Sequence, residues 1–108
     1  MGDAPVVLVR GTDTERIETT ASKLSDAFTV VTEAESADGI DCVVSLDANR
    51  SPTAHPFRDR VPLVVFGDAD PDAVRELLAA PGIEYVQRDI TAAHTVLADR
   101  VESAIRHS

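Results

Sequence analysis

Short apolar runs alternate with amphipathic stretches along this chain. Five mostly apolar runs, rich in β-branched residues, stand at positions 5–9, 29–32, 42–46, 62–66 and 83–87. Glycine, proline or polar residues bound them, and apolar runs of this length are typical of strands buried on both faces of a parallel sheet. The pattern therefore predicts five strands.

A helix is expected between the first two strands. Its apolar stripe covers about four turns of helix and is formed by Ile17, Ala21, Leu24 and Phe28. Thr12 and Glu15 have the spacing of a capping box, in which each side chain accepts a hydrogen bond from the other's backbone N–H. We therefore expect this helix to begin close to Thr12.

Two further helices are expected in the second half of the chain. Asp70 followed by Pro71 predicts an N-cap and a proline at the first helical position, opening a helix that runs through Ala80. Thr91 is expected to cap the last helix. The apolar face of that helix carries Ala93, Leu97, Val101 and Ile105.

The remaining connections lack a helical pattern. Residues 33–39 are too few and too polar for a full helix, and Pro52 and Pro56 discourage a regular helix within residues 47–60. Because parallel strands need right-handed crossovers, the order of elements favours an α/β fold. We expect a doubly wound, five-stranded parallel sheet of flavodoxin-like order 2-1-3-4-5, with shortened or missing second and third helices.

Composition narrows the function classes. Nineteen acidic residues against ten basic ones give a net charge of −9, which argues against nucleic acid or an anionic membrane as a partner. Nine of the ten basic residues are arginine. Either a GC-rich genome or adaptation to high salt, in a halophilic source, explains this acidic, arginine-rich composition.

The single cysteine and the apolar runs bear on location. One cysteine, Cys42, excludes an intramolecular disulfide framework and fits a reducing compartment. It stands inside a predicted strand, where a buried small hydrophobic residue is expected. The apolar runs are too short to span a membrane, and the first residues do not resemble a signal peptide. We expect a cytoplasmic protein.

Charged residues gather where the strands end. In open α/β sheets, ligands bind beyond the carboxyl ends of the strands. Because magnesium prefers converging carboxylates, the mixed charges at this edge oppose a metal site. An ion pair of Asp47 with Arg10 or Arg88 is one expectation, and simple charge balance is the other. The residues at the edge are Arg10, Gly11, Leu46, Asp47, Gly67, Asp68, Arg88 and Asp89.

Three segments resemble receiver domains of two-component signalling, with the closest likeness to those of halophilic archaea. They are IDCVVS at 40–45, PLVVFG at 62–67 and YVQRDITAAHTVLADRVESAIR at 85–106. They correspond to the third strand, the fourth strand and the final strand and helix of that family. Within it, Tyr85 resembles an aromatic switch position, although a packing role on the last strand is equally expected.

The resemblance implies five functional positions. In receiver domains, two acids after the first strand hold magnesium, and an aspartate after the third accepts a phosphoryl group from a histidine kinase. A Thr or Ser ends the fourth strand and a Lys ends the fifth. All five positions are altered here, which implies a degenerate receiver without catalytic residues, bound metal or cofactor. The residues at these positions are Arg10, Gly11, Leu46, Gly67 and Arg88.

The favoured hypothesis is a pseudo-receiver, a signalling module rather than an enzyme. Its expected partner is a protein: a histidine kinase, another signalling module, domains that follow it in the same chain, or a second copy in a homodimer. Residues 1–108 are expected to form one domain, either alone or as the amino-terminal module of a longer signalling protein.

Two alternatives stay open. In the first, the chain is an atypical active receiver in which Asp47 accepts the phosphoryl group. In the second, it is a small-anion sensor, with the anion held between Arg10 and Arg88.

Overall fold

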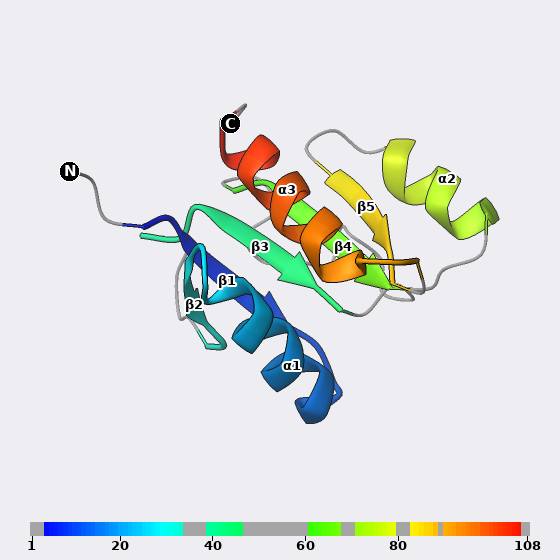
Figure 1. The fold of residues 1–108 in the computed structure, drawn as a ribbon. Helices are drawn as coiled ribbons and strands as arrows, with labels where there is room; N and C mark the ends of the chain where they lie inside the picture. Colours follow the sequence, from blue (N-terminus) through cyan, green and yellow to red (C-terminus); the bar gives the residue numbers. More distant parts are fainter. Residues whose placement is uncertain are drawn as a thin grey trace.

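A parallel sheet forms the centre of the structure, a computed structural model that describes residues 4–33, 39–46, 61–67, 71–79, 83–88 and 90–106. Its five strands have the order β2-β1-β3-β4-β5 (Figure 1), which confirms the predicted flavodoxin-like sheet. The strands are β1 (Val6–Arg10), β2 (Thr29–Val31), β3 (Cys42–Ser45), β4 (Leu63–Gly67) and β5 (Ile83–Gln87).

Three helices are described around this sheet. Helices α1 (Thr14–Leu24) and α3 (Ala93–Arg106) lie side by side against one face of the sheet (Figure 1). Helix α2 (Pro71–Ala79) packs against β5. No helix in the described part of the chain is both long enough and apolar enough to cross a membrane.

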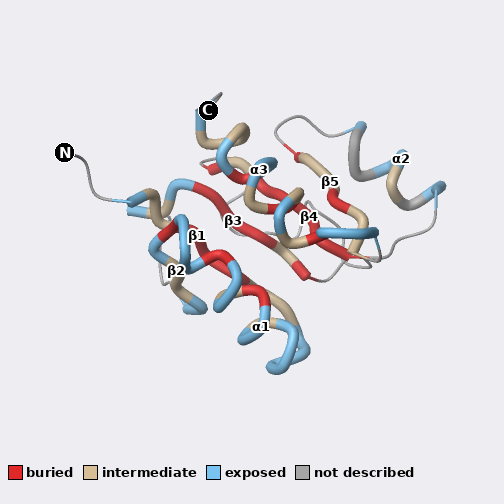
Figure 2. Tube along the Cα trace, viewed as in Figure 1, coloured by how far each residue is buried: buried red, intermediate tan, exposed pale blue. Residues whose placement is uncertain are grey.

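The core has two layers because successive strand residues point to opposite faces. Toward α1 and α3, alternate strand residues such as Val9, Val44 and Phe66 pack against Leu24 and Leu97. The other face carries a second buried cluster, and both faces of β3 and β4 are accordingly buried (Figure 2). This second cluster consists of Leu8, Val43, Val61, Leu63, Val65 and Ile83.

The start of α1 differs from the prediction. Asp13, and not Thr12, is the N-cap: its carboxylate accepts hydrogen bonds from the backbone N–H groups of Glu15, at 3.0 Å, and Arg16, at 3.4 Å. Asp13 has an extended backbone, with φ −98° and ψ 108°, which lets its side chain reach the first turn. The predicted capping box is therefore wrong.

The end of α1 also comes earlier than the apolar stripe predicts. The helix ends at Leu24 with Ser25 as its C-cap, and the Ser25 hydroxyl donates to the carbonyl oxygen of Ser22. Phe28 lies beyond the helix, yet it is buried in the same core because its backbone N–H is tied to the Leu24 carbonyl. Phe28 was thus correctly assigned to the core but not to the helix.

The last helix begins at Ala93, two residues after the predicted cap. Ala92, just before it, has a positive φ of 56°, and its carbonyl accepts from the N–H groups of Thr95 and Val96. The predicted buried positions Ala93, Leu97 and Val101 are confirmed. Three further predictions concern residues outside the described ranges and stay predictions. They are the Asp70 cap, the irregular loop at 47–60, and the shortened or missing second and third helices.

Candidate functional site

The carboxyl ends of the strands form a rim in which the ends of β1 and β3 are adjacent. Arg10 pairs with Ser45 in the register of these strands, and the Leu46 N–H donates to the Arg10 carbonyl at 2.8 Å. The next residues, Gly11 and Leu46, therefore stand side by side. The structure thus brings together two of the positions that the receiver resemblance singled out.

Leu46 fills the space beside Gly11. A Cβ atom added to Gly11 would lie 3.0 Å from the Leu46 Cβ and 3.6 Å from Cγ1 of Ile17. Leu46 is only 9% exposed and belongs to the core cluster beneath α1 and α3. An apolar contact therefore closes this part of the rim. We call this pair the sealed half of the rim.

The sealed half and the neighbouring Arg10 do not fit a magnesium ion. Magnesium is held by carboxylate, carbonyl and water oxygens in octahedral geometry. Here the side chains are a guanidinium on Arg10, none on Gly11 and an isobutyl group on Leu46. Across the residues that the structure describes, no three His, Cys, Asp or Glu side chains are grouped closely enough to hold a metal ion. Asp47 lies outside the described residues.

Gly67, which the receiver resemblance matched to the hydroxyl position, is buried and contributes only its backbone. Its carbonyl oxygen accepts the N–H of Arg88 at 2.8 Å. The Tyr85 hydroxyl lies 2.9 Å from the same oxygen and 2.8 Å from Oε1 of Gln87, so it donates its proton to one of these acceptors. Tyr85 is thereby held against the end of β4.

A cavity of about 330 Å³ opens beside the sealed half, between α1, α3 and the ends of β3, β4 and β5. We call it the open half of the rim. It brings together Leu46 and Arg88, but Arg10 is not among the described residues that line it. Strand alternation explains this, because Arg10 follows Leu8 on the opposite face. The lining residues are Glu15, Arg16, Thr19, Thr20, Leu46, Phe66, Arg88 and His94.

Sequence reasoning missed the contribution of α1 to this cavity. Arg16 and Thr20 are four residues apart and so share one face of the helix. The same spacing that identified the helix could have placed them together. It could not show that Arg88, from the far end of the chain, would meet them.

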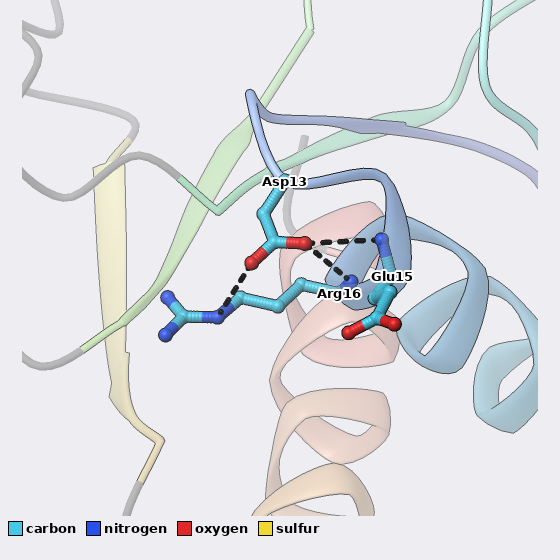
Figure 3. A network of polar contacts seen from close by, with 3 residues as sticks. All are labelled: Asp13, Glu15 and Arg16. Atoms are coloured by element: carbon cyan, nitrogen blue, oxygen red, sulfur yellow. Dashed lines mark hydrogen bonds and ion pairs between the residues drawn. The ribbon is translucent and has the colours of Figure 1, made fainter.

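Arg16 is oriented by the residue that caps its helix. Its Nε atom lies 3.5 Å from Oδ2 of Asp13, and the guanidinium extends away from α1 toward the ends of β4 and β5 (Figure 3). About half of each side chain is exposed, so the ion pair itself contributes under about 1 kcal/mol to stability. Its main effect is to direct the positive charge toward the cavity.

His94 lines the cavity and packs against Phe66. Its ring centroid lies 5.3 Å from that of Phe66, with the two planes tilted by 58°. Burial, and secondarily the charge of Lys23, lowers the pKa of His94 below its ordinary value of 6.5. The ring is consequently neutral at neutral pH.

Cys42 is buried in the core, as the sequence predicted. Burial raises the pKa of its thiol to about 12, so the thiolate is not populated at neutral pH. Since the thiolate is the reactive form, Cys42 has a packing role.

Comparison with solved structures extends the assignment of the fold. A response regulator receiver domain protein from Clostridium thermocellum superimposes with a TM-score of 0.73 at 17% identity, covering 95% of each chain. The fold is that of a receiver domain. A response regulator receiver protein from Pseudomonas putida gives 0.62 at 16% identity, covering 93% of this chain and 98% of that one.

A third solved structure with a similar fold is described by a different role. A putative pilus assembly-related protein from Burkholderia pseudomallei gives a TM-score of 0.70 at 15% identity, covering 95% of this chain and 90% of that one. No protein-family model and no curated protein sequence matches the chain. At these identities the likeness establishes the receiver fold, and function rests on the residues of the rim.

Proposed function

We propose that this chain is a pseudo-receiver, a signalling module that binds protein partners without being phosphorylated. The observation that carries the proposal is the sealed half of the rim. Gly11 and Leu46 occupy two of the receiver positions, and a Cβ on the first would crowd the second. The two residues form an apolar contact without a nucleophile or a metal ligand, which supports the loss of the reaction.

The other receiver positions agree with this proposal. Arg10 supplies a positive charge where receivers hold a cation, Gly67 has no hydroxyl, and Arg88 replaces a lysine. Arginine stays charged and presents a planar fork, so it does not substitute for a compact ammonium group. None of these changes restores phosphoryl transfer.

The proposed partners are proteins of a signalling pathway. A histidine kinase, another signalling module, domains later in the same chain and a second copy are the candidates. We infer a cytoplasmic location from the single cysteine, and a salt-rich source from the net charge of −9.

The decisive experiment challenges the chain with phosphorylating conditions. Acetyl phosphate with Mg²⁺, and separately beryllofluoride with Mg²⁺, would be added to the ¹⁵N-labelled protein, and an active receiver would verify the reagents. We expect no saturable change in the amide spectrum and no gain of a phosphoryl group by intact mass spectrometry. A phosphoryl adduct, or saturable shifts around residues 10–11 and 46, would overturn the proposal.

The same experiment separates the alternative in which Asp47 is phosphorylated. In that case the Asp47→Asn variant would lose the adduct that the parent chain acquires. A complementary measurement concerns the partner: purified histidine kinases of the source organism would be tested for binding with and without ATP. The pseudo-receiver is expected to bind its partner equally in both conditions, because no phosphoryl group is transferred.

A further inference from the structure

The open half of the rim combines an apolar interior with polar walls. Leu46 and Phe66, which are 9% and 2% exposed, supply aliphatic and aromatic surface to the cavity. Its volume of about 330 Å³ lies within the range of sites that hold small organic molecules. Such sites are mostly apolar and carry a few polar groups that orient the ligand.

Thr20 is the clearest sign that a ligand group belongs in this cavity. It is a polar residue that is only 2% exposed, and it lines the cavity. Within the described part of the chain, no hydrogen bond of its hydroxyl is found. A buried hydroxyl without a partner is unfavourable, so a ligand atom that bonds to Thr20 would remove an existing penalty.

The charges around the cavity favour a negative group. Arg16 and Arg88 both line it, and His94 places the amino-terminal turn of α3 at the same wall. The positive end of a helix dipole adds to the attraction for an anion. Arginine is also suited to bind a carboxylate through two parallel hydrogen bonds.

Two features limit the charge that the ligand can carry. Glu15, an exposed carboxylate, lines the same cavity. The chain as a whole carries a net charge of −9, which repels anions at long range. A multiply charged anion is therefore disfavoured, and binding must draw on apolar contact as well as on the arginines.

We propose that this cavity binds a small monocarboxylate with an aromatic or branched aliphatic body. The carboxylate contacts Arg16 and Arg88, and the body packs against Leu46 and Phe66. This site differs from an anion site between Arg10 and Arg88, because Arg10 follows the opposite face of the sheet. It goes beyond the proposed function and holds whether or not the chain is phosphorylated.

The test titrates phenylacetate into the ¹⁵N-labelled full chain. Acetate carries the charge alone and 2-phenylethanol carries the ring alone. We expect phenylacetate to produce saturable amide shifts at Phe66, Arg88 and His94. Because a hydrogen bond to a charged group is worth roughly a tenfold or larger change in affinity, both partial probes should bind at least about tenfold more weakly.

Variants assign the contacts by the direction of their effects. Arg16→Gln should weaken phenylacetate binding by about tenfold, whereas Glu15→Gln should strengthen it by removing the repelling charge. Arg100→Gln is the matched control, since Arg100 is an exposed arginine of α3 that is not among the lining residues. Thr20→Val should raise the melting temperature of the free chain and yet lower its affinity for phenylacetate.

Three results would overturn this site. The first is the absence of saturable shifts with phenylacetate up to about 10 mM, which would place the dissociation constant above that concentration. The second is equal affinity for phenylacetate and 2-phenylethanol, which would make the cavity an apolar one without anion recognition. The third is an equal effect of Arg16→Gln and Arg100→Gln.

Discussion

The two halves of the rim have opposite properties although they lie next to each other. In the sealed half, Leu46 packs beside Gly11 so closely that a Cβ on the glycine would lie 3.0 Å from the Leu46 Cβ. In the open half, residues of α1 and α3 line a cavity of about 330 Å³ together with Arg88 and the aromatic ring of Phe66. Leu46 belongs to both halves, because it contacts Gly11 and also lines the cavity.

This difference provides a test of the proposal that the chain has lost the receiver reaction. The sealed half extends the core outward by an apolar contact, and the open half keeps a cavity beside it. We expect substitutions at Gly11 and Leu46 to change stability, and those at the lining residues Glu15 and Arg16 chiefly to change binding.

The largest effect is expected for Leu46→Ala. Removing a buried leucine leaves a cavity, and such changes typically cost about 2–5 kcal/mol. Because Leu46 is 9% exposed and lies at the edge of the core, we expect the lower part of this range. Urea denaturation would measure it, with Leu46→Met as the control that keeps the volume. A loss below about 1 kcal/mol would show that Leu46 does not seal the rim.

A smaller loss is expected for Gly11→Ala. The added methyl group would press against the Cβ of Leu46, and overpacking of this kind costs about 1–3 kcal/mol. The close contact is with the Leu46 Cβ, an atom that alanine keeps, so the second change in a double-mutant cycle is Leu46→Gly. The double variant Gly11→Ala with Leu46→Gly should lose less stability than the sum of the single variants, because the added methyl group then meets no Cβ at position 46. Additive losses in this double-mutant cycle would contradict the direct contact.

Asp13→Ala comes next and affects the open half. The carboxylate caps α1 through the N–H groups of Glu15 and Arg16, and loss of an N-cap costs about 1 kcal/mol. It also releases the Arg16 guanidinium from its ion pair. Asp13→Ser keeps the cap without the negative charge, so it should retain most of the stability. Equal destabilisation by both variants in urea denaturation would mean that the cap is not the cause.

The sequence predicted the sheet well because its evidence is local. Val43 and Val44 stand in one apolar run, and each is buried on a different face of the sheet. The helix cap was harder, since Thr12 and Asp13 are adjacent and both can cap. The pattern of apolar positions does not distinguish a hydroxyl from a carboxylate that reaches two N–H groups.

The cavity could not be predicted, for a different reason. Arg16 and Arg88 are far apart in the sequence, and only the crossing of α1 over the ends of the strands brings them to one wall. The receiver resemblance drew attention to Arg10 and Arg88 instead. Strand alternation alone separates Arg10 from Arg88. Arg10 is two residues after Leu8, on one face of the sheet, and Arg88 is two residues after Val86, on the other. This separation could have been predicted from the sequence.

The smallest expected effect is a pH dependence of stability that comes from His94 in the open half. Its pKa is lower in the folded chain than the ordinary value of 6.5, so the unfolded chain binds a proton more readily. Its contribution is therefore fully present above pH 6.5 and is lost as the pH falls through the lower, folded pKa.

Urea denaturation of the parent chain and of His94→Gln across this range isolates the effect as a difference between the two curves. Titrating carboxylates affect both chains alike, and they cancel in that difference. The parent should lose more stability on acidification than the variant, because only the parent must accept a proton beside Phe66 and near Lys23. Parallel curves would mean that water reaches the His94 ring freely, and that the wall of the open half is looser than its contacts indicate.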